Sequence, residues 1–253
     1  MVTKRFLFLA AGVLCASAFT ASCSSDEDSL LEYGGQKYKT VVINGTELMA
    51  ENLNYYVPGS KCYNNDPANC AKYGRLYNWL MAMELPSSCD SRSCDSLIRT
   101  PHKGICPDGW HIPGNADWDK LYRSADGTFG TKSPYDSRTA GRYLKAKEGW
   151  NHCGPSGPSS SSGRSSSSGS SSSSGTGKSY LCEDALGFAA LPGGYSNQDV
   201  FNEAGEVGFW WRASENEDAA NAAYMSFIYH RFDDAHWGDS PKNYFYSVRC
   251  FKD

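Results

Sequence analysis

The stretch GPSSSSGRSSSSGSSSSSGTGK, from Gly157 to Lys178, consists almost entirely of Ser and Gly. This composition is typical either of a linker between two domains or of a loop within one domain. The sequence before it predicts helices and a single hairpin, whereas the 75 residues after it predict strands without a helix. Because each part lacks what the other supplies, we predict one domain with an inserted loop. Closing such a loop costs only about 0.6 kcal/mol for each doubling of its length.

The first folded segment predicts a hairpin and a helix. Two strand-like runs, 41–43 and 46–49, flank Asn44-Gly45, a pair that tolerates the positive φ angles of a type I′ turn. In CAKYGRLYNWLMAMEL, residues 70–85, apolar residues recur at nearly helical spacing. This pattern predicts one helix with one apolar face.

A second helix is expected further along the first half. Asp117 follows Gly114 at the spacing of a capping box, so the helix should begin there. The apolar residues Trp118, Leu121 and Tyr122 then supply its buried side. The run RYLKAKEGW, residues 142–150, predicts a further short helical turn.

The part of the chain after the Ser tract has a different residue pattern. Short aromatic-rich runs separated by Gly, Asn and Asp predict strands at 186–195, 206–214, 222–230 and 243–251. The predicted fold class is therefore α+β, with an N-terminal hairpin, two main helices and short twisted antiparallel strands.

The N-terminus has the features of an export signal. Lys4 and Arg5 precede an apolar stretch, Phe6–Phe19, that is too short to span a bilayer. Small residues then precede Cys23, and this arrangement resembles the lipobox of bacterial lipoproteins. We expect a lipid anchor on Cys23, which places the protein at the outer membrane or cell surface. Ordinary signal-peptidase cleavage nearby is the alternative.

These features divide the chain into three parts. Residues 1–22 are expected to form the signal peptide, and 23–34 a solvated tether. Residues 35–253 are expected to form the folded domain, with the Ser/Gly-rich loop inserted at 156–177.

Eight cysteines follow Cys23, and an even number in an exported chain indicates disulfides. Local spacing suggests Cys62–Cys70, Cys89–Cys94 and Cys153–Cys182, the last of which flanks the Ser tract. This leaves Cys106 to pair with Cys250. Zinc is the alternative, but the chain has no Cys-x-x-Cys motif and its nearby His residues lack ligand spacing, so we expect no metal site.

Seven segments in this order resemble the Fibrobacter succinogenes major paralogous domain family. They are YKTVVINGTELMAENLNY, CYNNDPANCAKYGRLYNWLMAM, GICPDGWHIPGNADWDKLY, YLKAKEGW, DALGFAALPGGY, GFWWRAS and YSVRC. The family is similar in pattern to C-type-lectin-like folds and to formylglycine-generating enzymes. The resemblance thus implies a disulfide-stapled, C-type-lectin-like domain interrupted by the Ser tract. It also implies that His111 and the Trp residues 110, 118, 210 and 211 are packed in the interior.

Composition and motifs argue against two classes of function. A net charge of −4 without a basic stripe excludes nucleic acid as an expected partner. None of the five His forms a His-Glu-x-x-His or triad motif, so we expect no catalytic residues. A formylglycine-generating-like enzyme remains the alternative implied by the resemblance, although its chemistry needs reactive cysteines.

We expect binding through the loops before the last strands, because lectin-like folds bind there. Carboxylate, amide and aromatic side chains in these loops suit sugar hydroxyls, sugar C–H faces or Ca²⁺. The candidate residues are Glu215, Asn216, Asp218, His230, Asp233, Asp234, Trp237 and Asp239. The motifs of calcium lectins are absent, so no cofactor is expected. The expected partners are the membrane, through the anchor, and a polysaccharide or surface protein. The alternatives are that these loops are merely solvated and that the protein is purely structural.

Overall fold

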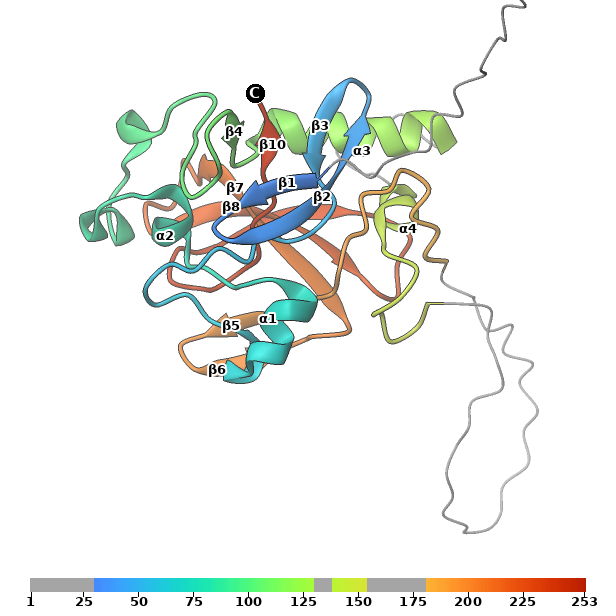
Figure 1. Cartoon of the computed structure of the whole chain (residues 1–253). Coiled ribbons are helices and arrows are strands. Elements are labelled where there is room, and N and C mark those ends of the chain that lie inside the picture. The colour runs from blue at the N-terminus through green and yellow to red at the C-terminus, as the bar shows by residue number, and fades with distance from the viewer. Residues whose placement is uncertain (1–29, 130–137, 154–180) are drawn as a thin grey trace, which may run out of the picture.

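The computed structural model describes residues 30–129, 138–153 and 181–253 (Figure 1). This part of the chain is a mixed helix and sheet structure with antiparallel strand pairing. The signal peptide, Cys23 and the Ser tract lie outside the described residues. Among the described residues, no helix has the length and apolar character needed to cross a membrane.

The largest sheet joins the two ends of the folded region. Its strand order is β1-β2-β3-β10-β4. The strands are β1 (Leu30–Tyr33), β2 (Gln36–Ile43), β3 (Thr46–Met49), β4 (Trp110–His111) and β10 (Phe251–Lys252). Phe251 of the last strand pairs with Leu48 on one side and with His111 on the other. The C-terminus is therefore built into the same sheet as the N-terminal strands. Because β1 pairs with β2, residues 30–33 belong to the folded domain, and the prediction that the tether extends to residue 34 is wrong.

The hairpin between β2 and β3 confirms the sequence prediction. Ile43 pairs with Thr46, and Asn44 and Gly45 form the turn with φ angles of 48° and 77°. Two consecutive positive φ angles define the type I′ turn that Asn-Gly favours.

The single helix predicted for 70–85 is wrong, because two short helices occupy this segment. They are α1 (Pro67–Tyr73) and α2 (Trp79–Met83). Gly74 ends the first helix with a φ of 77°, and Tyr77 then forms a β-bridge with Tyr246. The side chain of Asn78 caps the second helix by accepting a hydrogen bond from the Met81 amide. Tertiary pairing thus interrupts a pattern that looked continuously helical.

The helix α3 (Asn115–Phe129) begins close to the predicted position. The Gly114 amide donates to Asp117 Oδ2 at 2.9 Å, which is half of the expected capping box. The short turn predicted from Arg142 onward is the helix α4 (Ala140–Leu144). Three 3₁₀ turns complete the helical elements: η1 (Tyr63–Asn65), η2 (Ser87–Asp90) and η3 (Asp95–Leu97).

Five strands lie after the Ser tract, in two small sheets, before β10. The hairpin contains β5 (Tyr195–Asn197) and β6 (Val200–Asn202), and the three-stranded sheet contains β7 (Val207–Glu215), β8 (Ala222–Tyr229) and β9 (His236–Pro241). The predictions for β7 and β8 are confirmed. The strand β9 lies in a segment predicted to be a loop. The strands predicted at 186–195 and 243–251 are longer than those observed, because these segments contain isolated bridges and only the first residue of β5 and of β10.

The interior contains two hydrophobic clusters, and each draws on both sides of the Ser tract. One combines Tyr77 and Trp79 with Trp211 and Val248. The other includes Trp118 together with the C-terminal Trp210. The four Trp residues predicted to be internal are at most 5% exposed. Residues before and after the tract therefore share both hydrophobic clusters.

Four disulfides connect the described cysteines, in the pairs that the sequence analysis predicted. They are Cys62–Cys70, Cys89–Cys94, Cys106–Cys250 and Cys153–Cys182. The Cα atoms of Cys153 and Cys182 are 5.4 Å apart, so the two ends of the Ser tract start from neighbouring points.

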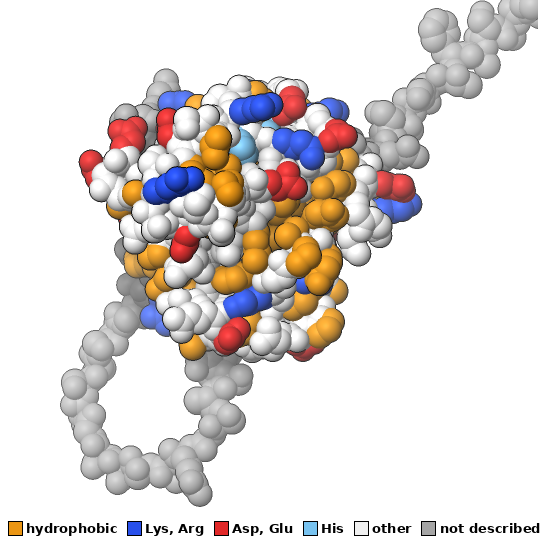
Figure 2. All heavy atoms as spheres, turned by 90° about the vertical axis from the view of Figure 1, so that its left-hand side faces the viewer, with side chains coloured by type: hydrophobic (Ala, Val, Ile, Leu, Met, Phe, Trp, Pro, Cys, Tyr) orange, Lys and Arg blue, Asp and Glu red, His pale blue; other side chains and the backbone are white. Residues whose placement is uncertain are grey.

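Hydrophobic side chains are not confined to the cores. Figure 2 views the molecule from the left-hand side of Figure 1, where α2 lies, and shows a band of hydrophobic side chains across this face. Large exposed hydrophobic residues of the whole described surface include Tyr56, Val200, Phe232 and Trp237.

Candidate functional site

The sheet β7–β8–β9 presents side chains alternately to its two faces. On one face, Trp237 of β9 lies opposite Ser226 of β8, and Asp239 lies opposite Tyr224. The Trp237 side chain is 44% exposed, and its ring meets the Tyr224 ring edge-on at a centroid distance of 5.6 Å. The neighbouring aromatic ring thus supports one side of the indole and leaves much of Trp237 open to solvent.

Arg212 lies beside this exposed ring. Its side chain is 2% exposed, and the guanidinium carbon is 5.8 Å from the Trp237 ring centre. Arg212 Nε donates to Ser226 Oγ at 2.9 Å, and Nη1 donates to Asn115 Oδ1 at 3.2 Å. Nη2 is buried and has no hydrogen-bond partner in the part of the chain that the structure describes. Burial lowers the pKa of the guanidinium from its ordinary value.

We call this group the Trp237 surface. It combines an exposed aromatic ring with amide, carboxylate and guanidinium groups from three elements. Its members are Trp237, Asp239, Tyr224, Arg212, Asn115 and Asp119, the last of which lies 3.9 Å from Arg212 Nη1. Of these residues, only Trp237 and Asp239 were predicted from the sequence. The alternation of side chains along β7 could have placed Arg212 on the face of Trp210, but nothing in the sequence pointed to the residues of α3.

Two predicted residues lie in the loop between β7 and β8. Asn216 Oδ1 accepts a hydrogen bond from the Asp218 amide at 2.8 Å, which is a local turn contact. Asp218 is exposed. This contact explains why Asn and Asp occur there without requiring a ligand.

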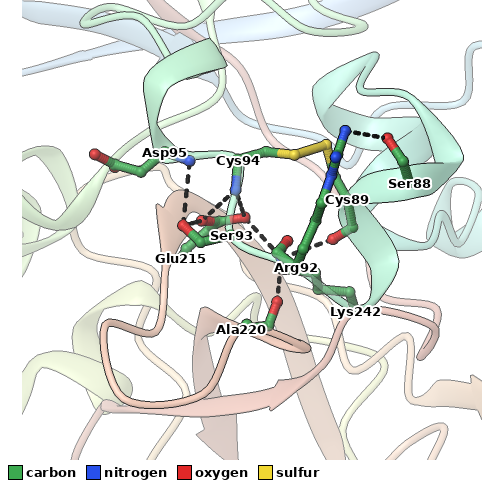
Figure 3. The surroundings of a disulfide bond; sticks show 9 residues. All are labelled: Ser88, Cys89, Arg92, Ser93, Cys94, Asp95, Glu215, Ala220 and Lys242. Carbon is green, nitrogen blue, oxygen red and sulfur yellow. Dashed lines mark hydrogen bonds and ion pairs between the residues drawn. A yellow bond between two sulfur atoms is a disulfide. The ribbon is translucent and has the colours of Figure 1, made fainter.

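Glu215 is not at the surface, where a ligand could reach it. Its carboxylate accepts hydrogen bonds from Lys242 Nζ at 2.6 Å, from Ser93 Oγ at 2.6 Å and from the Cys94 amide at 3.0 Å (Figure 3). Burial tends to raise its pKa, but these hydrogen bonds outweigh burial and hold the pKa below its ordinary value. The prediction of Glu215 as a ligand-binding residue is therefore replaced by a structural role.

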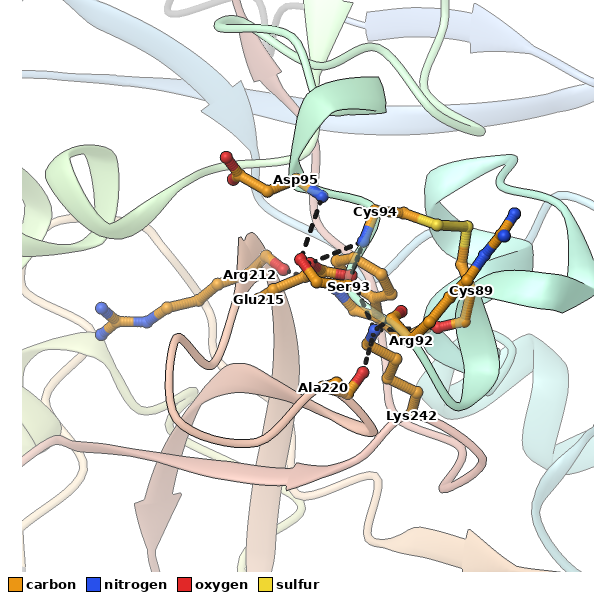
Figure 4. A network of polar contacts seen from close by, with 10 residues as sticks. Cys89, Arg92, Ser93, Cys94, Asp95, Arg212, Glu215, Ala220 and Lys242 are labelled. Carbon is orange, nitrogen blue, oxygen red and sulfur yellow. Dashed lines mark hydrogen bonds and ion pairs between the residues drawn. A yellow bond between two sulfur atoms is a disulfide. The ribbon is translucent and has the colours of Figure 1, made fainter.

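Lys242 completes the same buried network. Besides Glu215, its ammonium donates to the carbonyl oxygens of Cys89 at 2.8 Å and Ala220 at 2.6 Å. Figure 4 shows Lys242 and Glu215 together beneath the Cys89–Cys94 loop, with Arg212 extending away from them. The network fastens the disulfide loop to β7 and to the segment after β9. The network therefore has a structural role. The carboxylate of Glu215 and the ammonium of Lys242 form their hydrogen bonds with other groups of the protein.

The remaining predicted residues surround the segment between β8 and β9. His230 is buried, and burial lowers the pKa of its imidazole, with a further contribution from His152. Asp234 Oδ2 lies 3.0 Å from His236 Nε2. Among the described residues, the Oδ1 atoms of Asp233 and Asp234 are buried without a hydrogen-bond partner.

A buried lysine lies against this segment. Lys145 Nζ donates to the carbonyl oxygens of Phe232 at 2.5 Å and His230 at 3.4 Å. Burial lowers the pKa of Lys145 to about 8, although the charges of Asp233 and Asp234 partly oppose the shift. The charges of the two aspartates therefore act on a cation of the protein itself, Lys145.

The opposite face of the sheet contains aromatic residues that the sequence analysis did not assign to a site. Phe209 of β7 pairs with Phe227 of β8, and their ring centres are 6.0 Å apart. Tyr195 and Tyr229 lie beside these two rings. Phe209 is buried and stacks against Tyr246, whereas the two tyrosines are only partly buried.

Metal ligands and acid–base residues are the last candidates for a functional site. Within the described ranges, no group of three or more His, Cys, Asp and Glu side chains is arranged to hold a metal ion. His111 is buried, and its Nδ1 lies 2.8 Å from Asp253 Oδ1, which confirms its packed, hydrogen-bonded role. It lines a pocket of about 160 Å³ near the start of α3. The flanking carboxylates of Asp117 and Asp253 outweigh burial and raise its pKa.

A family model described as the Fibrobacter succinogenes major domain matches residues 36–252. The matched range runs across both sides of the Ser tract. No curated protein and no solved structure gives a match.

Proposed function

The chain belongs to the Fibrobacter succinogenes major domain family, and we propose that it is an exported, lipid-anchored surface protein that binds carbohydrate at the Trp237 surface. The exposed ring of Trp237 carries this proposal. An indole held edge-on by Tyr224 offers a flat apolar face that suits the C–H face of a sugar ring. Rigid aromatic side chains of this kind contribute much of the energy at binding surfaces.

The groups around the ring suit sugar hydroxyls. Asp239 is exposed on the same side of β9, and Asp119 is partly exposed on α3. The Asn115 side chain accepts a hydrogen bond from Arg212 and keeps its own N–H groups for other acceptors. Donors and acceptors thus border the aromatic face, as a ligand with many hydroxyl groups requires.

One further observation supports binding over formylglycine generation. All eight described cysteines are in disulfides, whereas formylglycine generation needs reactive thiols. A disulfide-stapled α+β domain with a three-stranded C-terminal sheet is compatible with the C-type-lectin-like fold that the family resemblance implies. We include that fold in the proposal.

A glycan array tests the binding proposal with the full chain in detergent. Trp237→Ala should reduce binding by roughly 30-fold, which corresponds to about 2 kcal/mol for the loss of a central aromatic residue. Tyr56→Ala is the matched control, because Tyr56 is an exposed aromatic residue on another element. Absence of saturable binding to any plant or bacterial polysaccharide would refute the proposal, and so would equal loss in both variants.

The anchor is tested separately. Cys23→Ala should move the protein from the detergent phase to the aqueous phase in phase partitioning and should abolish labelling with a fatty acid analogue. Cys15→Ala is the control, because Cys15 precedes the proposed cleavage point. Unchanged membrane association of the Cys23 variant would remove the anchor from the proposal without affecting the binding site.

A further inference from the structure

We infer that the Trp237 surface continues into the pocket at the start of α3, and that the two together bind a chain of at least two uncharged sugar units. This inference rests on the proposed carbohydrate function and adds the length and the charge of the ligand. We call the second part the α3 pocket. Its volume is about 160 Å³, and it is lined by residues of three segments: 99–102, the start of α3 with the residues just before it, and the end of β7.

Asn115 joins the α3 pocket to the Trp237 surface. It lines the pocket, and its Oδ1 accepts a hydrogen bond from Arg212 Nη1 at 3.2 Å. The guanidinium carbon of Arg212 lies 5.8 Å from the centre of the Trp237 ring. Because Arg212 is buried, it forms the floor between the ring and the pocket. A ligand stacked on Trp237 can therefore extend over Arg212 to Asn115 and into the pocket.

The strand β7 fixes the two parts relative to each other. The Ala213 amide donates to the Pro113 carbonyl oxygen at 3.0 Å, which holds the end of β7 against the start of α3. Arg212 belongs to the Trp237 surface, whereas the next two residues, Ala213 and Ser214, line the α3 pocket. The ring and the pocket are thus held in place before a ligand arrives, which lowers the entropy cost of binding one chain at both.

The α3 pocket contains polar groups that the protein does not use itself. Among the described residues, the hydroxyl groups of Thr100 and Ser214 and the side-chain N–H groups of Asn115 make no hydrogen bond. Pro101 and Ala116 add apolar surface to the same pocket. An apolar lining with a few polar groups is typical of sites for small ligands. Sugar hydroxyl groups both donate and accept, so they suit this mixture.

Charge favours an uncharged ligand in the pocket. The Asp117 carboxylate accepts a hydrogen bond from the Gly114 amide at 2.9 Å and lies 3.4 Å from His111 Nε2. Arg99 lines another part of the pocket, and no carboxylate of the described residues lies within ion-pair distance of it. An anion would therefore meet the charge of Asp117 and a cation that of Arg99, and like charges placed together are unfavourable. A neutral sugar unit avoids both.

A single sugar unit is the competing ligand. Stacked on Trp237, it would leave the α3 pocket to water, because Arg212 and Asn115 lie between the ring and the pocket. A second unit would reach the free hydroxyl and amide groups there. The two readings differ in how affinity depends on the length of the sugar chain.

The test measures this dependence by NMR titration of the full chain, in a detergent without a sugar headgroup. The probes are oligomers of one to four units of β-1,4-linked glucose, mannose and xylose, with oligogalacturonate as the charged comparison. In a series that binds, we expect Kd to fall about tenfold or more between one and three units, because two or three hydrogen bonds are added. Equal Kd values for all lengths, or tighter binding of oligogalacturonate, would overturn the inference and leave the Trp237 proposal intact. Absence of binding in every series would also overturn it, whereas the glycan array decides the Trp237 proposal separately.

Variants place the second sugar unit. Ala116→Phe fills the α3 pocket and should remove the gain with length, so that trimers bind no more tightly than the single sugar. Ala68→Phe is the matched control and should keep the gain, because Ala68 and Ala116 are both exposed and each is the second residue of a helix. Trp237→Ala should instead weaken all lengths by a similar factor. A gain that survives in Ala116→Phe would place the second unit elsewhere and overturn the inference.

A second variant keeps the test decisive if Ala116→Phe does not fold. Ser214→Ala removes one hydroxyl group from the pocket and should weaken the binding of oligomers about threefold without changing that of the single sugar. An equal change for the single sugar and the oligomers would contradict the assignment of Ser214 to the second unit.

Discussion

The ammonium of Lys242 lies 2.6 Å from the carboxylate of Glu215 inside the protein, where their side chains are 0% and 4% exposed. The two charges come from the two outer strands of the C-terminal sheet, at the same end of it, since Glu215 ends β7 and Lys242 follows β9. Together they hold the Cys89–Cys94 loop through Ser93 and two backbone groups. A buried pair of this kind is costly to break, because one charge would remain desolvated.

Lys242→Met should destabilise the protein by about 3–5 kcal/mol, since it leaves the Glu215 carboxylate buried without its cation. Urea unfolding measures the change. Lys37→Met is the control, because Lys37 forms an exposed ion pair with Glu32 and should cost at most about 1 kcal/mol. The double variant Lys242→Met/Glu215→Leu should be more stable than either single variant. Purely additive losses would contradict the role assigned to the pair.

The sequence predicted the parts of the fold that local chemistry determines. Asn44-Gly45 specifies its own turn, and the local spacing of the cysteines identified three of the disulfides, which left Cys106 to pair with Cys250. The aromatic runs of β7 and β8 have the composition of strands. The split between α1 and α2 was missed, because Tyr77 pairs with Tyr246, which lies 169 positions later in the chain. The strand β9 was missed because HWGDSP contains Gly and Pro and little apolar periodicity.

The candidate site was less predictable for the same reason. Trp237 and Asp239 could be recognised by residue type, but Glu215 was assigned to the surface because acidic residues are seldom buried without a partner. Its partner, Lys242, is separated from it by two strands. Arg212 and Asn115 come together only through the packing of α3 against β7. Contacts between distant segments therefore decide which polar residues are free to bind.

Removal of the Cys106–Cys250 disulfide should lower the free energy of unfolding more than removal of any other described disulfide. It spans 144 positions, so the chain-entropy model gives about 5 kcal/mol, compared with about 2.5 kcal/mol for Cys62–Cys70, which spans 8. Double Ala variants of each pair, compared by urea unfolding, test this order. The Cys106 pair also secures β10 between β3 and β4, which adds to its effect. A larger loss for the Cys62 pair would contradict the prediction.

Because of Lys145, the free energy of unfolding should change with pH in the alkaline range. Its pKa is about 8 in the folded protein, whereas the unfolded chain keeps the ordinary lysine pKa of 10.5 and so binds the proton more tightly. The sign follows from this difference: below pH 8 both states are protonated and stability is flat, and between pH 8 and 10.5 stability rises, by up to about 3 kcal/mol. Lys145→Met should remove this rise. Lys147→Met, which alters an exposed neighbour, should retain it, and an identical pH profile for both variants would refute the assignment.

Deletion of Ser159–Ser174 should leave the melting temperature within a few degrees of the wild-type value. The described residues on either side of the tract are already joined, since Cys153 bonds to Cys182 and Arg142 pairs with Glu183. Trp150 Nε1 also donates to the Ala190 carbonyl oxygen at 3.0 Å across the same gap.

Duplication of the same 16 residues provides the matched control, because it changes loop length in the opposite direction with the same composition. Loop-closure entropy predicts a cost of about 0.6 kcal/mol or less for the longer loop. Both variants should therefore unfold in a single transition near the wild-type temperature when followed by calorimetry. If the deletion abolished cooperative unfolding while the duplication did not, the tract would contribute native contacts of its own, and its description as an inserted loop would be wrong.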